Sequence, residues 1–152
     1  MGGGSDATAG WADHDGVVMS RSETPRAPLC EDLAGALRAE GISVPILIES
    51  QGLGRYPQEV ETAVVLTCLE ALQNVEQHAA ATRIKVWLAQ ADADLVFAVI
   101  DDGAGFDRRA VEHNTGFARM RHHMASVGGT VNIESQPGVG TTVLGRVPGS
   151  GS

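Results

Sequence analysis

The chain has 152 residues, 43% hydrophobic and 20% charged, with a formal net charge of -8 and two cysteines that match no metal or redox spacing. This composition fits one globular domain, and the acidic excess argues against nucleic acid as a partner. Because no apolar run approaches the roughly 20 residues that span a membrane and no signal-peptide pattern opens the chain, we expect a cytoplasmic domain without direct membrane contact.

Low-complexity ends flank one folded region. Residues 1–24 are rich in Gly, Ser, Ala and Asp without an apolar period, which is typical of a flexible leader or linker. Residues 149–152 have the composition of a similar tail. We therefore expect a single domain over residues 25–148.

Apolar periodicity within this region predicts three helices, over residues 28–40, 58–78 and 116–127. Glycines follow the first and the third of them, where they are typical helix ends. The stretch from Phe106 to Thr115, before the third helix, is polar and charged, and its composition suggests a mobile loop.

Alternation and β-branched residues predict about five strands, over residues 42–49, 81–90, 95–100, 130–135 and 141–147. Pro45 within the first suggests that this strand lies at an edge of the sheet. Short turns join the other four into two hairpins. The order of elements predicts an α+β fold, a sandwich in which three helices cover one face of a mixed sheet of about five strands.

Polar residues recur on the long helix beside its apolar stripe. Glu70, Asn74 and His78 are spaced four residues apart, which places them on one face. Such a trio by itself is often a solvated helix face. The functional interpretation is that the amide oxygen of Asn74 binds Mg²⁺ and Glu70 orients water.

The acidic and glycine-rich run from Asp101 to Phe106 follows a strand that reads as buried. Alone, this run predicts a turn. A carboxylate fixed at a strand end also accepts a hydrogen bond from an exocyclic amine, and Asp101 is closest to the strand. Gly103 and Gly105 would let a flat base approach the backbone.

Two more glycine motifs follow. Gly116 leads into the third helix, whose first amides are free to bind a phosphate, and Arg119 and Arg121 add positive charge. Taken alone, this is an ordinary helix start. The run from Pro137 to Thr142 is on its own a hairpin turn.

In this order the four motifs resemble the N, G1, G2 and G3 boxes of the Bergerat-fold (GHKL) superfamily of ATPases and kinases. Residues 69–79 and 116–121, together with the short lid from Phe106 to Thr115, look like the ATP-binding catalytic domain of a bacterial two-component sensor histidine kinase of the nitrate-sensor-like subclass. The resemblance covers about Pro28 to Pro148.

The resemblance implies ATP and Mg²⁺ as ligands. It implies that Asn74 binds Mg²⁺, that Glu70 is a catalytic residue and that His78 lies near the phosphates. The other ATP-binding residues that it implies are Asp101 for the adenine amine, Gly103, Gly105 and Phe106 around it, Gly116, Phe117 and Arg119 toward the phosphates, and Thr141 in support of Asp101.

No dimerising helical hairpin with a phosphoacceptor histidine is found before Pro28. The implied partners are therefore a separate phosphoacceptor and dimerisation domain and, through it, a response regulator. We expect the isolated domain to be a monomer that binds ATP but transfers phosphate poorly or not at all. A stand-alone serine kinase of the anti-sigma type is one alternative.

Two positions depart from the subclass pattern. Gln77 stands where a Lys or Arg is frequent, and His123 stands where an Arg is usual. A non-catalytic interaction module with a degenerate nucleotide pocket is therefore a second alternative.

Overall fold

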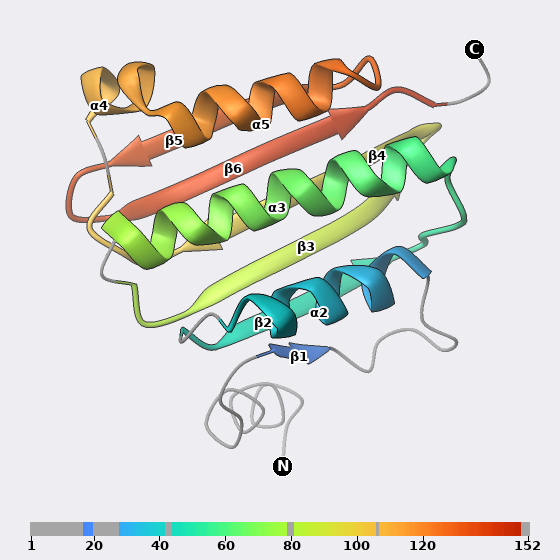
Figure 1. Cartoon of the computed structure of the whole chain (residues 1–152), viewed down its shortest axis with the longest axis horizontal. Coiled ribbons are helices and arrows are strands. Elements are labelled where there is room, and N and C mark those ends of the chain that lie inside the picture. Colours follow the sequence, from blue (N-terminus) through green and yellow to red (C-terminus); the bar gives the residue numbers. More distant parts are fainter. Residues whose placement is uncertain (1–16, 20–27, 42–43, 79–80, 106, 150–152) are drawn as a thin grey trace.

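The computed structural model describes residues 17–19, 28–41, 44–78, 81–105 and 107–149. Figure 1 shows the arrangement of its helices and strands. In chain order the elements are β1 (Val17–Met19), α2 (Pro28–Glu40), β2 (Ile46–Gln51), α3 (Gln58–His78), β3 (Ile84–Ala91), β4 (Asp94–Asp101), α4 (Arg108–His113), α5 (Thr115–Ala125), β5 (Thr130–Gln136) and β6 (Gly140–Val147).

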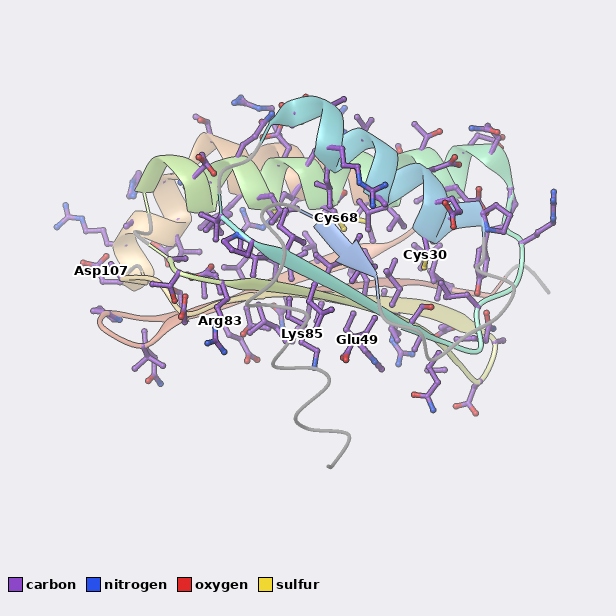
Figure 2. The ribbon with its side chains drawn as sticks, turned by 90° about the horizontal axis from the view of Figure 1, so that it is seen from below. Cys30, Glu49, Cys68, Arg83, Lys85 and Asp107 are labelled. Atoms are coloured by element: carbon purple, nitrogen blue, oxygen red, sulfur yellow. The ribbon has the colours of Figure 1, made fainter. Side chains whose placement is uncertain are left out.

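The strands form one six-stranded mixed sheet in the order β1-β2-β3-β4-β6-β5. The pairs β1–β2 and β2–β3 are parallel, and the pairs β3–β4, β4–β6 and β6–β5 are antiparallel. Helices α2, α3 and α5 lie side by side over one face of the sheet (Figures 1 and 2). The predicted α+β sandwich is thereby confirmed.

The strands bury one face because their apolar residues alternate. In β3, Ile84, Val86 and Leu88 are fully buried against the helices, whereas side chains at the positions between them point to the other face. Lys85 is one of these, and its Nζ lies 2.8 Å from Glu49 Oε1 on the neighbouring strand. Figure 2 shows this ion pair on the side of the sheet away from the helices.

Helix α3 supplies the centre of the core. The expected apolar stripe faces the sheet, with Val65 and Leu69 partly buried at its margin and Val64, Cys68, Ala71, Leu72 and Val75 at most 5% exposed. Cys30 of α2 joins the same cluster, and Figure 2 shows both thiols between the helices and the sheet. Burial raises the pKa of Cys68 to about 12, which fits a packing role.

Strand β1 falls within residues 1–24, which we expected to form a leader. It pairs with the outer side of β2, so the predicted edge position of β2 is wrong. Pro45 immediately precedes β2, and its carbonyl accepts the Ile84 amide at 3.0 Å. A proline at that point removes no ladder bond, which explains why it is tolerated beside a central strand.

Helix α4 occupies the stretch in which a mobile loop was expected. The Asp107 side chain caps it by accepting the Ala110 amide at 2.8 Å. Helix α5 follows after Asn114, which caps it in turn, and its C-terminal turn ends at Gly128 with a φ of 73°. The described residues thus contain four helices rather than three, and none of these is both long and apolar enough to cross a membrane.

Candidate functional site

A small cavity lies between α3, α5 and the sheet. Its volume is about 10 Å³, and its walls are Ala71, Asn74, Val75, Val99, Asp101, Phe117, Thr141 and Val143. Apolar walls with a few converging polar groups are typical of a ligand site. The present volume has room for about one water molecule, so a larger ligand requires the walls to separate.

Asp101 ends β4 at the floor of this cavity. Its side chain is 7% exposed, and its Oδ1 accepts the amide of Gly103 at 2.8 Å. Burial raises the pKa of Asp101, although hydrogen bonds from the Gly103 and Thr141 amides oppose the rise. A buried carboxylate of this kind is a strong acceptor for a ligand N–H donor.

The neighbouring acid, Asp102, has a different task. It accepts the amides of Thr82 at 2.8 Å and Arg83 at 3.2 Å, and it also accepts the Thr82 hydroxyl. Burial acts against the ionised form, but these bonds outweigh it and hold the pKa of Asp102 below its ordinary value. Asp102 therefore clamps the start of β3 to the end of β4 and leaves the cavity to Asp101.

Thr141 stands opposite Asp101 in the β4–β6 ladder. Its Oγ1 lies 2.8 Å from Ser135 Oγ, which also donates to the Gly140 carbonyl at 3.2 Å. The hydroxyl of Thr141 is thus fixed at the cavity wall by a residue that the sequence motifs did not single out. Its position beside Asp101 matches the supporting role implied by the resemblance, which stays a prediction.

The glycines near Asp101 are required by contacts between two stretches of backbone. A methyl group at Gly140, whose φ is 138°, would lie 2.2 Å from the Asp101 carbonyl oxygen. At Gly105, with a φ of 74°, it would lie 2.1 Å from the Gln136 carbonyl oxygen. The loop after β4 therefore packs directly on the β5–β6 turn, and the predicted contact of Gly103 and Gly105 with a base stays a prediction.

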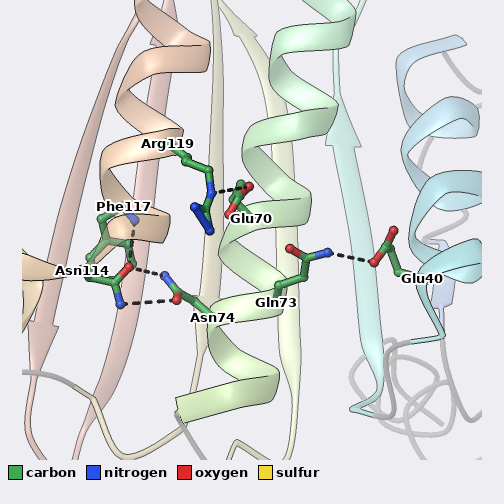
Figure 3. A network of polar contacts seen from close by, with 7 residues as sticks. All are labelled: Glu40, Glu70, Gln73, Asn74, Asn114, Phe117 and Arg119. Atoms are coloured by element: carbon green, nitrogen blue, oxygen red, sulfur yellow. Dashed lines mark hydrogen bonds and ion pairs between the residues drawn. The ribbon is translucent and has the colours of Figure 1, made fainter.

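An amide pair joins α3 to the start of α5 (Figure 3). Asn74 Nδ2 donates to Asn114 Oδ1 at 3.3 Å, and Asn114 Nδ2 donates back to Asn74 Oδ1 at 3.4 Å. Asn114 Oδ1 also accepts the Phe117 amide at 2.9 Å. Gly116 packs against both side chains, because a methyl group there would lie 3.0 Å from each.

The structure thus brings Asn74, Gly116 and Phe117 together as expected, and it adds Asn114. An Asn directly before a helix is a typical N-cap, and this signal was present in the sequence. Its contact with Asn74 joins positions 40 residues apart, which local patterns do not reveal.

Glu70 and Arg119 form an ion pair on the outer side of the α3–α5 seam (Figure 3). Arg119 Nε lies 3.2 Å from Glu70 Oε2, and the two side chains are 58% and 19% exposed, respectively. The predicted catalytic acid and the predicted phosphate-binding arginine are therefore partners of each other, one helical turn from Asn74.

Two predicted site residues are not placed. His78 is the last residue of α3, and its side chain, like that of Gln77, lies outside the described part of the structure. Phe106 also lies outside the described residues. Their expected roles at the nucleotide stay predictions.

The chain matches a known protein family whose expected motifs and fold are those described above. Residues 59–150 match the family described as histidine kinase-, DNA gyrase B-, and HSP90-like ATPases. The chain belongs to this family. The resemblance found from the four motifs is therefore confirmed at this level, whereas the nitrate-sensor-like subclass stays a prediction.

Relatives within this ATPase family include histidine kinases. The signal transduction histidine-protein kinase/phosphatase DegS of Brevibacillus brevis is 30% identical over 95 residues, which cover 62% of this chain and 25% of DegS. An uncharacterized sensor-like histidine kinase of Chloroflexus aurantiacus is 32% identical over 127 residues, covering 78% of this chain and 21% of the relative. The chain thus spans a quarter or less of these relatives.

A solved structure shows the same ATPase fold. The histidine kinase domain of a blue-light activated histidine kinase from Erythrobacter litoralis superimposes with a TM-score of 0.63 at 24% identity. The match covers 80% of this chain and 59% of that chain. It supports the sandwich fold described above.

Proposed function

We propose that this chain is the ATP-binding catalytic domain of a sensor histidine kinase and that it binds ATP with Mg²⁺. The observation that carries the proposal is the convergence of the buried Asp101 carboxylate and the buried Asn74 amide on one cavity of the ATPase fold. One group accepts a hydrogen bond from a base, and the other is an oxygen ligand for a metal bound to phosphates.

The adenine end of the site is the end at Asp101. Its carboxylate accepts a hydrogen bond from the exocyclic amine, and Val99 and Val143, which are paired in the β4–β6 ladder, offer an apolar surface to one side of the base. Ligand pockets commonly measure about 300–1,000 Å³, far more than the about 10 Å³ between these walls. Binding therefore requires the walls of the cavity to separate.

The phosphate end of the site is the seam between α3 and α5. The amide oxygen of Asn74 is a hard ligand of the kind that Mg²⁺ prefers, with phosphate oxygens and water as the other ligands. The described residues include no group of three or more His, Cys, Asp or Glu side chains suited to hold a metal ion, so the metal depends on the phosphates. The first turn of α5 begins beside Asn74, and its Phe117 amide, which now donates to Asn114 Oδ1 at 2.9 Å, is a donor that a phosphate oxygen would use in place of Asn114.

The reaction is transfer of the γ-phosphoryl group to a histidine imidazole of a separate phosphoacceptor domain. The bond between the γ-phosphorus and the bridging oxygen breaks, a phosphorus–nitrogen bond forms, and ADP leaves. This chain would supply position and charge: Asn74 would hold Mg²⁺, which would neutralise phosphate charge, and Glu70 would orient the attacking group. The phosphate then passes to a response regulator in the cytoplasm.

Calorimetric titration with a non-hydrolysable ATP analogue tests the binding step. We expect one site per chain, weaker binding without Mg²⁺, and a loss of about 10- to 100-fold in affinity for Asp101→Asn. Asp102→Asn is the matched control, because its amide oxygen still accepts the Thr82 and Arg83 amides. Equal loss in both variants, or no saturable binding by the unmodified chain, contradicts the proposal.

A second test concerns the phosphoacceptor. A labelled partner domain is exposed to acid after incubation with the chain and ATP. Loss of the label indicates phosphohistidine, whereas its persistence indicates the serine-kinase alternative.

A further inference from the structure

We propose that Asn114 is a further residue of the nucleotide site. Its side chain is hydrogen-bonded to the two groups that Mg²⁺ and the phosphates would bind, the Asn74 side chain on α3 and the Phe117 amide on α5. The inference rests on the proposed function, since it assumes that Asn74 and the start of α5 receive Mg²⁺ and phosphate. It adds a competing side chain that nucleotide must displace.

The orientation of the Asn114 amide is fixed by the backbone. An N–H group can only donate, so the atom of Asn114 that lies 2.9 Å from the Phe117 amide nitrogen is the oxygen Oδ1. Nδ2 of Asn114 then faces Asn74 and donates to its Oδ1 at 3.4 Å. The oxygen that we assign to Mg²⁺ is therefore already hydrogen-bonded to Asn114.

The Asn114 side chain also binds the second group, the Phe117 amide at the start of α5. Asn114 Oδ1 accepts both the Phe117 amide and Asn74 Nδ2, so a phosphate oxygen that approaches the first turn of α5 meets an amide that is already capped. Asn74 is 7% exposed, and both polar atoms of its side chain are paired with Asn114. One carboxamide thus covers the metal ligand and a phosphate donor together.

The packing around the pair leaves little spare space. A methyl group at Gly116 would lie 3.0 Å from Asn114 Oδ1 and from Asn74 Nδ2, and 3.1 Å from Asn74 Oδ1. The adjoining cavity, whose walls include Asn74 and Phe117, has a volume of about 10 Å³. The amide pair is therefore a polar contact that holds α5 against α3 over the site, as Figure 3 shows.

Two substitutions separate the two contacts. Asn114→Ser retains the N-cap, because a Ser hydroxyl accepts the same kind of amide, but it is too short to reach Asn74. Asn114→Gly leaves both Asn74 and the Phe117 amide uncovered, and glycine weakens an N-cap only slightly. Asn132→Ser, on the exposed side of β5, is a matched control for the loss of a carboxamide.

The experiment is a calorimetric titration of the four proteins with a non-hydrolysable ATP analogue plus Mg²⁺ and, separately, with adenosine. We expect affinity for the Mg²⁺–triphosphate to increase about threefold in Asn114→Ser and about tenfold in Asn114→Gly. Affinity for adenosine changes less, because adenosine has neither phosphates nor metal to use the uncovered groups. Asn132→Ser has no effect.

A nuclear magnetic resonance titration gives an independent readout. The side-chain amide signals of Asn74 and Asn114 should shift together as the Mg²⁺–triphosphate is added, with one dissociation constant. A signal of Asn114 that stays in place, unchanged or weaker triphosphate binding in both variants, or an equal gain for adenosine overturns the inference. Failure of all four proteins to bind either ligand instead overturns the proposed function.

Discussion

Replacing Gly140 by alanine should damage both the fold and the site, and Gly138 offers a matched control on the same turn. Both glycines have positive φ, 138° and 79°, so an alanine at either position is strained. A methyl group at Gly138 meets nothing within 4 Å, whereas at Gly140 it would lie 2.2 Å from the Asp101 carbonyl oxygen. The difference between the two variants therefore contains the collision with Asp101 together with any difference in backbone strain.

The magnitudes follow from these two contributions. Alanine at Gly138 costs about 1–2 kcal/mol in the free energy of unfolding, from backbone strain alone. At Gly140, strain of about 1–3 kcal/mol adds to overpacking of about 1–3 kcal/mol. We expect Gly140→Ala to be the less stable variant by roughly 2 kcal/mol, a difference of about 1 M in the urea midpoint at a typical slope.

Urea unfolding followed by circular dichroism measures this difference. Nucleotide titration of the two folded variants then shows whether Asp101 has moved, and we expect weaker binding in Gly140→Ala alone. Equal urea midpoints would refute the reasoning, because they would mean that the β5–β6 turn and the Asp101 backbone are not in tight contact.

Two further predictions follow from the cavity. Since burial raises the pKa of Asp101, adenine-nucleotide affinity should begin to fall, as the pH decreases, at a pH above the ordinary carboxyl pKa. The contribution of Asp101 to stability is present below its unfolded pKa and is lost as the pH rises through its folded pKa. Nucleotide titrations and unfolding curves from pH 4 to 8 check both trends, and an affinity that follows an ordinary carboxyl pKa would contradict the first. Phe117 is 1% exposed, so Phe117→Ala should lower the free energy of unfolding by about 3–5 kcal/mol in urea titrations, and a change below about 1 kcal/mol would mean that α5 is not packed as described.

Much of the fold could be predicted because its long elements have strong periodic patterns. The stripe on α3 and the alternation in β3 follow from burial on one side, and the apolar run from Leu95 to Ile100 predicts β4; the structure places all three as expected. Strand β1 has three residues in a stretch of low complexity, and its parallel pairing with β2 is a long-range contact. Helix α4 has six residues, too few for a clear period. Such elements depend on tertiary contacts more than on local sequence.

The candidate site shows the same division. Asp101 and Asn74 were predictable because each stands at a fixed place in an ordered series of motifs, and the structure brings both to one cavity. Asn114 was not predicted, because a cap residue and a binding residue have the same local pattern. The close backbone contacts of Gly105 and Gly140 also could not be predicted from the sequence, because a glycine in a turn can be required for several different reasons.

The buried cysteines make thiol chemistry a measure of local opening. Cys30 and Cys68 are the only cysteines of the chain, and they are 1% and 0% exposed. Because both thiols are buried, an alkylating reagent can reach them only when α2 and α3 separate from the sheet. Burial also raises the pKa of Cys68 to about 12, which lowers its reactivity further because the thiolate is the reactive form. The rate of alkylation therefore reports the opening of the core without any label, and a cysteine introduced on the surface could carry a fluorophore while both native thiols remain in place.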